Sequence, residues 1–260
     1  MKIIVCIKQV PDTNDIKWTE NNTIQREGVE SIINPFDLYA IETALKIKNT
    51  LPDVEITVVS MGPLQAEKML RHTIALGCDK GVLISDKKFA GADTYATGKT
   101  LATAIKSKLG DFDLIICGQF AIDGDTAQTG PSIASQLGIP QITFVRELKQ
   151  CSQDSICAVR EIEEGFETVK AQLPALICVL KGLEDTSRAK INGVIRAKNT
   201  VVDVYSMEDI ELNPEDTGIK GSPTYVSKAF RPVHNRGECE FCKDSSSLAQ
   251  KIVEYGGLHE

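Results

Sequence analysis

The sequence predicts an α/β protein with a mainly parallel sheet and helices on both faces. Four nearly continuous apolar runs are typical of buried parallel strands. They are KIIVCIKQV (2–10), VEITVVSMG (54–62), KGVLIS (80–85) and FDLIICGQ (112–119). Helical patterns separate them, and this βαβ alternation brings the carboxyl ends of the strands to one edge of the sheet. Ligands of such sheets bind beyond that edge, so we expect the functional site there.

Three helices are predicted between these strands. Apolar residues recur at helical spacing in PFDLYAIETALKIKN (35–49), PLQAEKMLRHTIALG (63–77) and DTYATGKTLATAIKSKLG (93–110). Proline is favoured in the first turn of a helix and glycine just after its last turn. Pro63 and Gly77 therefore bound the second helix, and Gly110 closes the third.

The pattern changes from about Arg146. Short alternating runs with turn signals in FVRELKQCSQDSICAVREIEEGFETVKAQLPALICVLKG (144–182) predict antiparallel strands added at a sheet edge. After Lys198 the chain is weakly periodic and ends in the amphipathic SLAQKIVEYGGLHE (247–260). We therefore expect one domain over residues 1–198 and an extended C-terminal arm over 199–260 that packs on another chain.

The composition is that of an acidic globular protein. Apolar residues make up 42% of the 260 residues, and the formal net charge is -7. Non-specific binding to nucleic acid needs a positive surface field, so that role is disfavoured. Apolar runs stay short of the ~20 residues of a membrane span, and the N-terminal run is too brief for a signal peptide. We expect a soluble, cytoplasmic protein without membrane insertion.

The cysteines fit a reducing compartment. Five of the eight lie within or beside apolar runs, as buried free thiols do: Cys6, Cys78, Cys117, Cys157 and Cys178. Cys239 and Cys242 form a C-x-x-C pair, but no second pair has zinc spacing and His234 alone is a poor complement. We interpret this pair as incidental, with a redox or metal role as the weaker alternative.

The stretch GQFAIDGDTAQTGP (118–131) predicts a phosphate site, because a strand end leads into a helix start. A helix start offers unpaired N–H donors, and Gly130 lets the backbone approach closely. Asp125 is expected to cap the helix, while Asp123 forms an Asx-turn or reaches a ribose hydroxyl. Two aspartates supply too few hard ligands for a metal cage. The alternative is a capped helix start without any ligand.

The chain resembles the β subunit of electron transfer flavoproteins. The resemblance covers nearly its whole length and rests on VCIKQVPDT, INPFDLYAIETAL, VVSMGP and AIDGDTAQTGP. It implies an adenine-nucleotide hydrolase-like sandwich, an arm packed on an α subunit, and a set of nucleotide contacts. These are Cys6, Asn34, Pro35, Phe36, Asp37, Met61, Phe120, Ala121, Ile122, Asp123, Gly124, Asp125, Thr126, Ala127, Gln128, Thr129, Gly130 and Pro131.

The nucleotide in this family is either a structural AMP or, in the electron-bifurcating branch, FAD that faces NADH. Asp93, Thr94 and Thr97 begin the helix after KGVLIS, and they place a second set of N-terminal donors at the same sheet edge. A diphosphate has more to bind than a monophosphate does. This stretch and Gly124 are similar to bifurcating members. The resemblance therefore implies FAD, NADH oxidation, and ferredoxin and a flavin-dependent dehydrogenase as partners. An ordinary cap at Asp93 or Thr94 is the alternative.

The segment from Lys181 to Lys198 is a basic island on an acidic chain. Ile191, Val194 and Ile195 form an apolar cluster within it, which suits an interface. By resemblance this is the family's recognition loop, and Ile191 falls at the position of the inserted residue. Asn192 and Gly193 depart from the commoner pattern. The alternative is that the apolar residues pack into the core of this chain.

Overall fold

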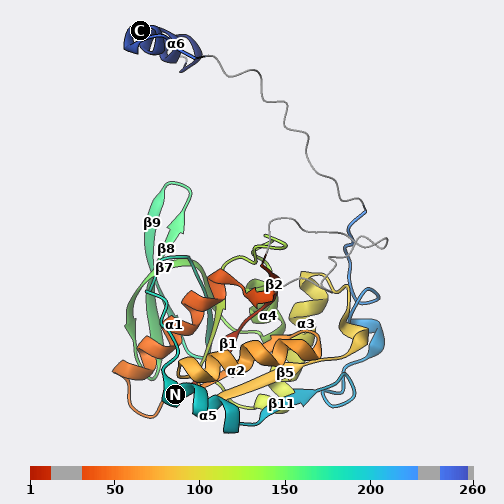
Figure 1. Ribbon diagram of the computed structural model, residues 1–260. Helices are drawn as coiled ribbons and strands as arrows, with labels where there is room; N and C mark the ends of the chain where they lie inside the picture. The colour runs from red at the N-terminus through yellow and green to blue at the C-terminus, as the bar shows by residue number, and fades with distance from the viewer. Residues whose placement is uncertain (13–30, 228–240, 257–260) are drawn as a thin grey trace. The chain divides into compact units, whose positions relative to one another are not determined.

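The computed structural model describes residues 1–12, 31–227 and 241–256. Contacts divide the chain into two units, Met1–Ser227 and Lys228–Glu260, and each is described by itself. The first unit holds a large, mostly parallel sheet flanked by helices, which confirms the predicted α/β class (Figure 1).

The main sheet has nine strands in the order β11-β5-β4-β1-β6-β10-β7-β8-β9. Their bounds are β1 Lys2–Cys6, β4 Glu55–Met61, β5 Lys80–Ile84, β6 Leu114–Gly118, β7 Gln141–Cys151, β8 Ser155–Ile162, β9 Gly165–Gln172, β10 Ala175–Val179 and β11 Val202–Tyr205. A separate antiparallel pair joins β2 (Gln9–Pro11) to β3 (Ser31–Ile33). The pairs from β11 to β7 are parallel, whereas β8 and β9 are antiparallel additions at the edge.

The helices cover the two faces of this sheet. They are α1 Pro35–Thr50, α2 Glu67–Leu76, α3 Thr94–Ala104, α4 Thr129–Leu137 and α5 Ile191–Asn199, with short helical turns at η1 Leu64–Ala66, η2 Lys87–Phe89, η3 Ile105–Leu109 and η4 Pro214–Asp216. In β1, Ile3 and Val5 join the core formed with α1 and α2, whereas Ile4 and Cys6 join the core formed with α3 and α4. Both faces of the central strands are buried, which explains their continuous apolar runs.

Two strands lie elsewhere than the sequence pattern predicts. The run ALICV (175–179) was expected among the antiparallel edge strands, but β10 is an interior strand, parallel to both β6 and β7. It is wholly buried, and a short continuous apolar run fits an interior parallel strand better than an edge strand. The segment after Lys198 contributes β11, which pairs with β5 at the sheet edge. The compact unit therefore continues to Ser227, beyond the expected boundary at 198.

In the second unit the structure describes one helix, α6 (Ser245–Gly256), within the predicted amphipathic segment. Leu248, Ile252 and Tyr255 share one face of it at helical spacing and are exposed. An isolated helix of this length is marginal in water.

Candidate functional site

The predicted site residues lie where β1, β4 and β6 end and where α1, α3 and α4 begin. Cys6 and Met61 end β1 and β4, and both pack in the same core cluster. The loop from Gln119 to Gln128 connects β6 to α4. The carboxyl edge of the sheet therefore gathers the candidate residues, as the βαβ pattern predicts.

The capping of α4 differs from the expectation. This helix begins at Thr129, and its N-cap is Gln128, which makes no side-chain cap hydrogen bond. The assignment of Asp125 as the cap was wrong, because the loop continues beyond Asp125 and Thr126 before the helix starts. Asp125 and Ala127 have φ angles of 50° and 56° in the left-handed region, which L-residues other than Asn and Asp rarely adopt. The loop is thus held in a strained conformation.

An ion pair holds the acidic part of this loop. The Nζ atom of Lys8, just beyond β1, lies 2.5 Å from Oδ1 of Asp123, whose side chain is 1% exposed. The backbone N–H groups of Gly124 and Asp125 both donate to the carbonyl of Ala121. The carboxylate of Asp123 is therefore turned onto a protein cation. The negative charge of Asp123 is therefore balanced by Lys8.

Asn34, the N-cap of α1, holds the other side of the loop by hydrogen bonds. Asn34 is buried, and its amide Nδ2 donates to the carbonyl of Phe120, while its Oδ1 accepts from Ile122 N–H. Pro35 opens the helix at N1, where its missing N–H costs no helical hydrogen bond. Asn34 therefore links the start of α1 to residues 120–122 by two hydrogen bonds, which is consistent with its predicted place at the site.

Asp37 is a buried carboxyl group at the same corner. Its Oδ2 accepts from the backbone N–H of Lys8 at 2.7 Å. Burial raises the pKa of Asp37 from 3.8 to about 7, and the hydrogen bonds from Lys8, Asn34 and Gly118 only partly offset this. A Cβ atom at Gly118 would lie 2.3 Å from Asp37 Oδ1, so glycine is required where α1 crosses the end of β6.

An aromatic cluster lines this corner. Phe36 and Phe120 meet edge to face with centroids 5.4 Å apart, and Phe120 meets Phe144 at 5.9 Å. Sequence reasoning missed Phe144, which has a φ of 56° at a bulge in β7. It also missed Gln119, whose Oε1 accepts from Phe144 N–H at 2.5 Å, and Lys8. In the sequence, only the positions of Lys8 and Gln119 shortly after β1 and β6 indicate that these residues lie at the site.

The amino ends of α3 and α4 lie together. A Cβ atom at Gly98 would lie 2.2 Å from Ser132 Oγ, so the two helices pack closely along this contact. At their starts, Thr94 Oγ1 lies 3.5 Å from Gln128 Oε1. Thr97 is half-buried in the first turn of α3. Asp93 is the N-cap of α3 and accepts from Ala96 N–H at 2.9 Å, as in the alternative of an ordinary capped helix start.

Gly130 rests on a row of buried thiols. Cys6, Cys117 and Cys178 are register partners on the adjacent strands β1, β6 and β10. Hydrogen bonding to Cys117 and burial raise the pKa of the Cys6 thiol, and bonding to Cys178 raises the pKa of Cys117. A Cβ atom at Gly130 would lie 2.4 Å from Cys178 Sγ. Close helix–sheet packing therefore requires this glycine, a reason other than the expected approach to phosphate. Pro131 follows it in the first turn of α4.

Helix α5 presents the predicted apolar cluster to the surface. Ile191, Val194 and Ile195 are 78%, 53% and 55% exposed. The alternative that they pack into the core was wrong, because this helix buries Ala197 instead. Arg196 holds α5 on α2 by donating to the carbonyls of Ile74 and Cys78.

The structure describes only part of the remaining candidate features. Within residues 1–12, 31–227 and 241–256, no group of three or more His, Cys, Asp or Glu side chains is arranged to hold a metal ion. Cys242 is half-buried, and Cys239 and His234 lie outside the described residues. Cys157, expected to be buried, is also half-buried.

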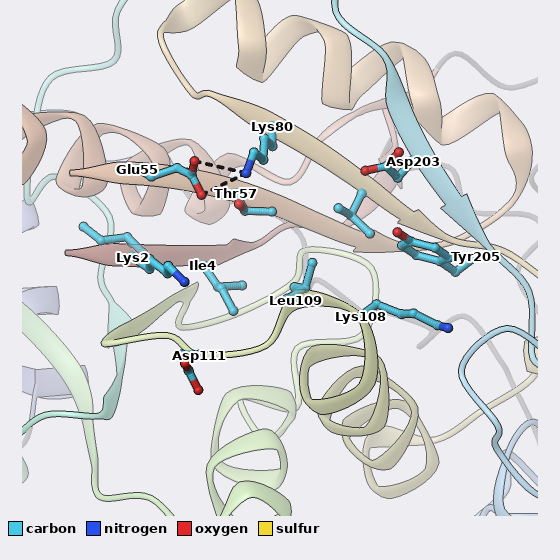
Figure 2. Close-up of a pocket in the computed structure, with 12 residues that line it drawn as sticks. Lys2, Ile4, Glu55, Thr57, Lys80, Lys108, Leu109, Asp111, Asp203 and Tyr205 are labelled. Atoms are coloured by element: carbon cyan, nitrogen blue, oxygen red, sulfur yellow. Dashed lines mark hydrogen bonds and ion pairs between the residues drawn. The ribbon is translucent and has the colours of Figure 1, made fainter. Parts of the chain in front are cut away.

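A hollow of about 230 Å³ lies mainly near the amino ends of the strands. Figure 2 shows its lining, which includes Lys2, Lys80, Lys108, Glu55, Asp111 and Asp203. Lys80 pairs with Glu55 at 3.0 Å. Basic and acidic groups are balanced there, and the lining contains none of the predicted site residues, so the hollow is separate from the candidate site.

The comparison with known families decides the identity. The model of the electron transfer flavoprotein domain matches residues 21–207. The electron transfer flavoprotein subunit beta of Megasphaera elsdenii is 44% identical over 91% of this chain and 90% of its own length. The chain belongs to the electron transfer flavoprotein β-subunit family.

Other members of the β-subunit family belong to named reductase complexes. The caffeyl-CoA reductase-Etf complex subunit CarD of Acetobacterium woodii is 45% identical over 91% of this chain and 90% of its own. The acryloyl-CoA reductase electron transfer subunit gamma of Anaerotignum propionicum is 42% identical over 89% of both. Across the part of this β subunit that the structure describes, no helix is long and apolar enough to cross a membrane.

Proposed function

We propose that this β subunit holds FAD at the carboxyl edge of its sheet and oxidises NADH within an electron-bifurcating complex. The observation that carries the proposal is the close approach of two helix starts, α3 and α4, beside the loop 119–128. The start of α4 offers N–H donors, the start of α3 offers the hydroxyls of Thr94 and Thr97, and each start is the positive end of a helix dipole. Two adjacent starts suit a diphosphate, which has two anionic groups to satisfy.

The residues at this edge fit such a group. No described side chain caps α4, so the first N–H groups of this helix are available to an anion. Thr126, Thr129 and the N–H groups near Ala127 and Gly130 are the proposed diphosphate contacts. Thr94 and Thr97 supply hydroxyl donors from α3, while the carboxylate of Asp93 is engaged by the helix that it caps.

The proposed chemistry and partners extend what the names of the relatives say. When bound, FAD supplies hydride acceptance from NADH, and the protein positions and tunes it. The electrons are then divided between ferredoxin and, through an FAD of the α subunit, a dehydrogenase of the acyl-CoA, enoyl-CoA or lactate type. The names of relatives from acryloyl-CoA and caffeyl-CoA reductase complexes support the dehydrogenase partner. We place the complex in the cytoplasm of an organism with anaerobic metabolism.

The second candidate is a carrier subunit that binds AMP for structural reasons and does not oxidise NADH. The absence of a described side-chain cap on α4 fits a monophosphate equally well. The α3 start is the feature that distinguishes the two, because a monophosphate at α4 leaves Thr94 and Thr97 without a ligand.

The test is the nucleotide content of the complex purified with its α subunit. The proposal expects two FAD per αβ pair, no AMP, and bleaching of flavin absorbance by NADH. Thr94→Val should lower β-site FAD occupancy, whereas Thr50→Val, at the far end of α1, should not. One FAD and one AMP per pair, with no reaction with NADH, would favour the second candidate.

A further inference from the structure

Asp93 binds a distant part of the chain as well as its own helix. Its Oδ2 accepts from both the backbone N–H and the Oγ1 of Thr224, at 3.0 and 2.8 Å. Its own N–H donates to Ser222 Oγ at 2.8 Å, and that hydroxyl donates to the carbonyl of Gly218. Hydrogen bonds to an ionised carboxylate are charge-assisted and stronger than those between neutral groups. Asp93 therefore joins the start of α3 to residues 222–224.

The chain before Thr224 runs across α3 as a strap, residues 213–224. Thr217 is buried, and its Oγ1 lies 2.8 Å from that of Thr100 in α3. The carboxylate of Asp216 pairs with Lys99 at 2.8 Å. These contacts fix the middle of the strap on the helix, and Asp93 fixes the end of it at the amino start.

The end of the strap lies close to the loop that leads to α4. Thr224 is bonded to Asp93. Thr94, next to Asp93, lies against Gln128 of that loop. The end of the strap is therefore held beside the proposed diphosphate seat.

We propose that Asp93 is a positioning residue that holds residues 222–224 at the amino start of α3 and thereby keeps the nucleotide seat closed on that side. The inference rests on the proposed function and assigns to Asp93 a role other than contact with the cofactor. Hydrogen bonds from Ala96 and Thr224 turn both oxygens of this carboxylate toward the protein. The hydroxyl of Thr224 is the part of the attachment that a substitution can remove with little other change.

The test compares Thr224→Val with Thr224→Ser in the full complex with the α subunit. Valine keeps the shape of threonine but loses the hydroxyl, and serine keeps the hydroxyl. Thr50→Val is the matched control, because Thr50 is also exposed and its hydroxyl also makes one hydrogen bond, to Ile47. The readouts are the rate at which the bound nucleotide leaves after large dilution, measured as nucleotide that no longer elutes with the complex, and the thermal midpoint of the complex.

The expected result is nucleotide release about five to ten times faster in Thr224→Val, the factor of one exposed hydrogen bond of ordinary strength. Thr224→Ser and Thr50→Val should release it at the wild-type rate, with all midpoints nearly unchanged. Equal rates in Thr224→Val and wild type would overturn the proposal, and so would a Thr224→Ser rate as fast as that of valine. The chemical identity of the released nucleotide, FAD or AMP, tests the proposed function separately. The release rates of variant and wild type can be compared whichever of the two nucleotides is bound.

Discussion

Replacement of Gly130 by alanine tests what this glycine does at the start of α4. The added Cβ would lie 2.4 Å from Cys178 Sγ, more than an ångström inside an ordinary contact, and Cys178 is 1% exposed. Neighbouring strands enclose the thiol on both sides, so it has little room to move. Overpacking of this kind costs about 1–3 kcal/mol. In a chain of this size each kcal/mol lowers the midpoint by roughly 2–4 °C.

The clash has one defined partner, which makes a rescue possible. Cys178→Ala removes the sulfur, and the next nearest atom, Cδ2 of Leu176, lies at an ordinary 3.4 Å. The double variant Gly130→Ala/Cys178→Ala should therefore be more stable than the sum of the two single effects, by about 1–3 kcal/mol. Thermal unfolding of the complex with its α subunit measures this coupling, and absorbance measures retained nucleotide.

The double variant also separates packing from ligand contact. Because the Cβ direction at Gly130 points to the sheet, stability and nucleotide retention should recover together. Additive losses of stability would refute the assigned clash. Recovered stability with nucleotide still lost would show that Gly130 faces the phosphate, as the sequence pattern predicts.

Three further outcomes are expected. The pKa of Asp37 in the folded state is raised from 3.8 to about 7. Between those values the free energy of unfolding should fall by about 1.4 kcal/mol per unit rise in pH, because the folded state keeps a proton that the unfolded state has lost. Thermal scans from pH 4 to 8 should therefore show the unfolding midpoint of Asp37→Asn rising relative to that of wild type up to pH 7. Midpoints that change in parallel would contradict this. Ile191→Ala should weaken dehydrogenase docking by about 1–3 kcal/mol in titrations while NADH reduction is unchanged; equal loss of both would place the docking surface elsewhere. Chelator treatment should leave nucleotide binding intact, since Lys8 already balances Asp123, and nucleotide loss on removing divalent ions would indicate a metal.

The sequence predicts the architecture well because it depends on local patterns. Continuous apolar runs place β1, β4, β5 and β6, and Gly77 and Gly110 end the second and third helical segments as expected. The position of β10 was missed because apolar periodicity describes burial and does not describe which strands are neighbours. Only pairing over long sequence distances sets that neighbour order.

At the candidate site the residue types were informative and their partners were not. The motif around Thr126 locates the loop, but the pairing of Asp123 with Lys8 joins residues 115 positions apart. The same holds for Asp93 and Thr224, 131 positions apart. No pattern of spacing contains such contacts, because the folded sheet alone brings these segments together.

The place of β10 has a consequence for the order of folding. This strand lies between β6 and β7, which both precede it in the chain, so the sheet stays divided until residues 175–179 arrive. Such non-local pairing is slow relative to local helix formation, and during synthesis it waits for the strand to emerge. Gly130 rests on Cys178 of that strand, so α4 takes its final seat only after β10 has inserted. A nucleotide bound at the proposed seat on α4 would therefore bind late, to a finished sheet, and would not act as a template for the early stages of folding.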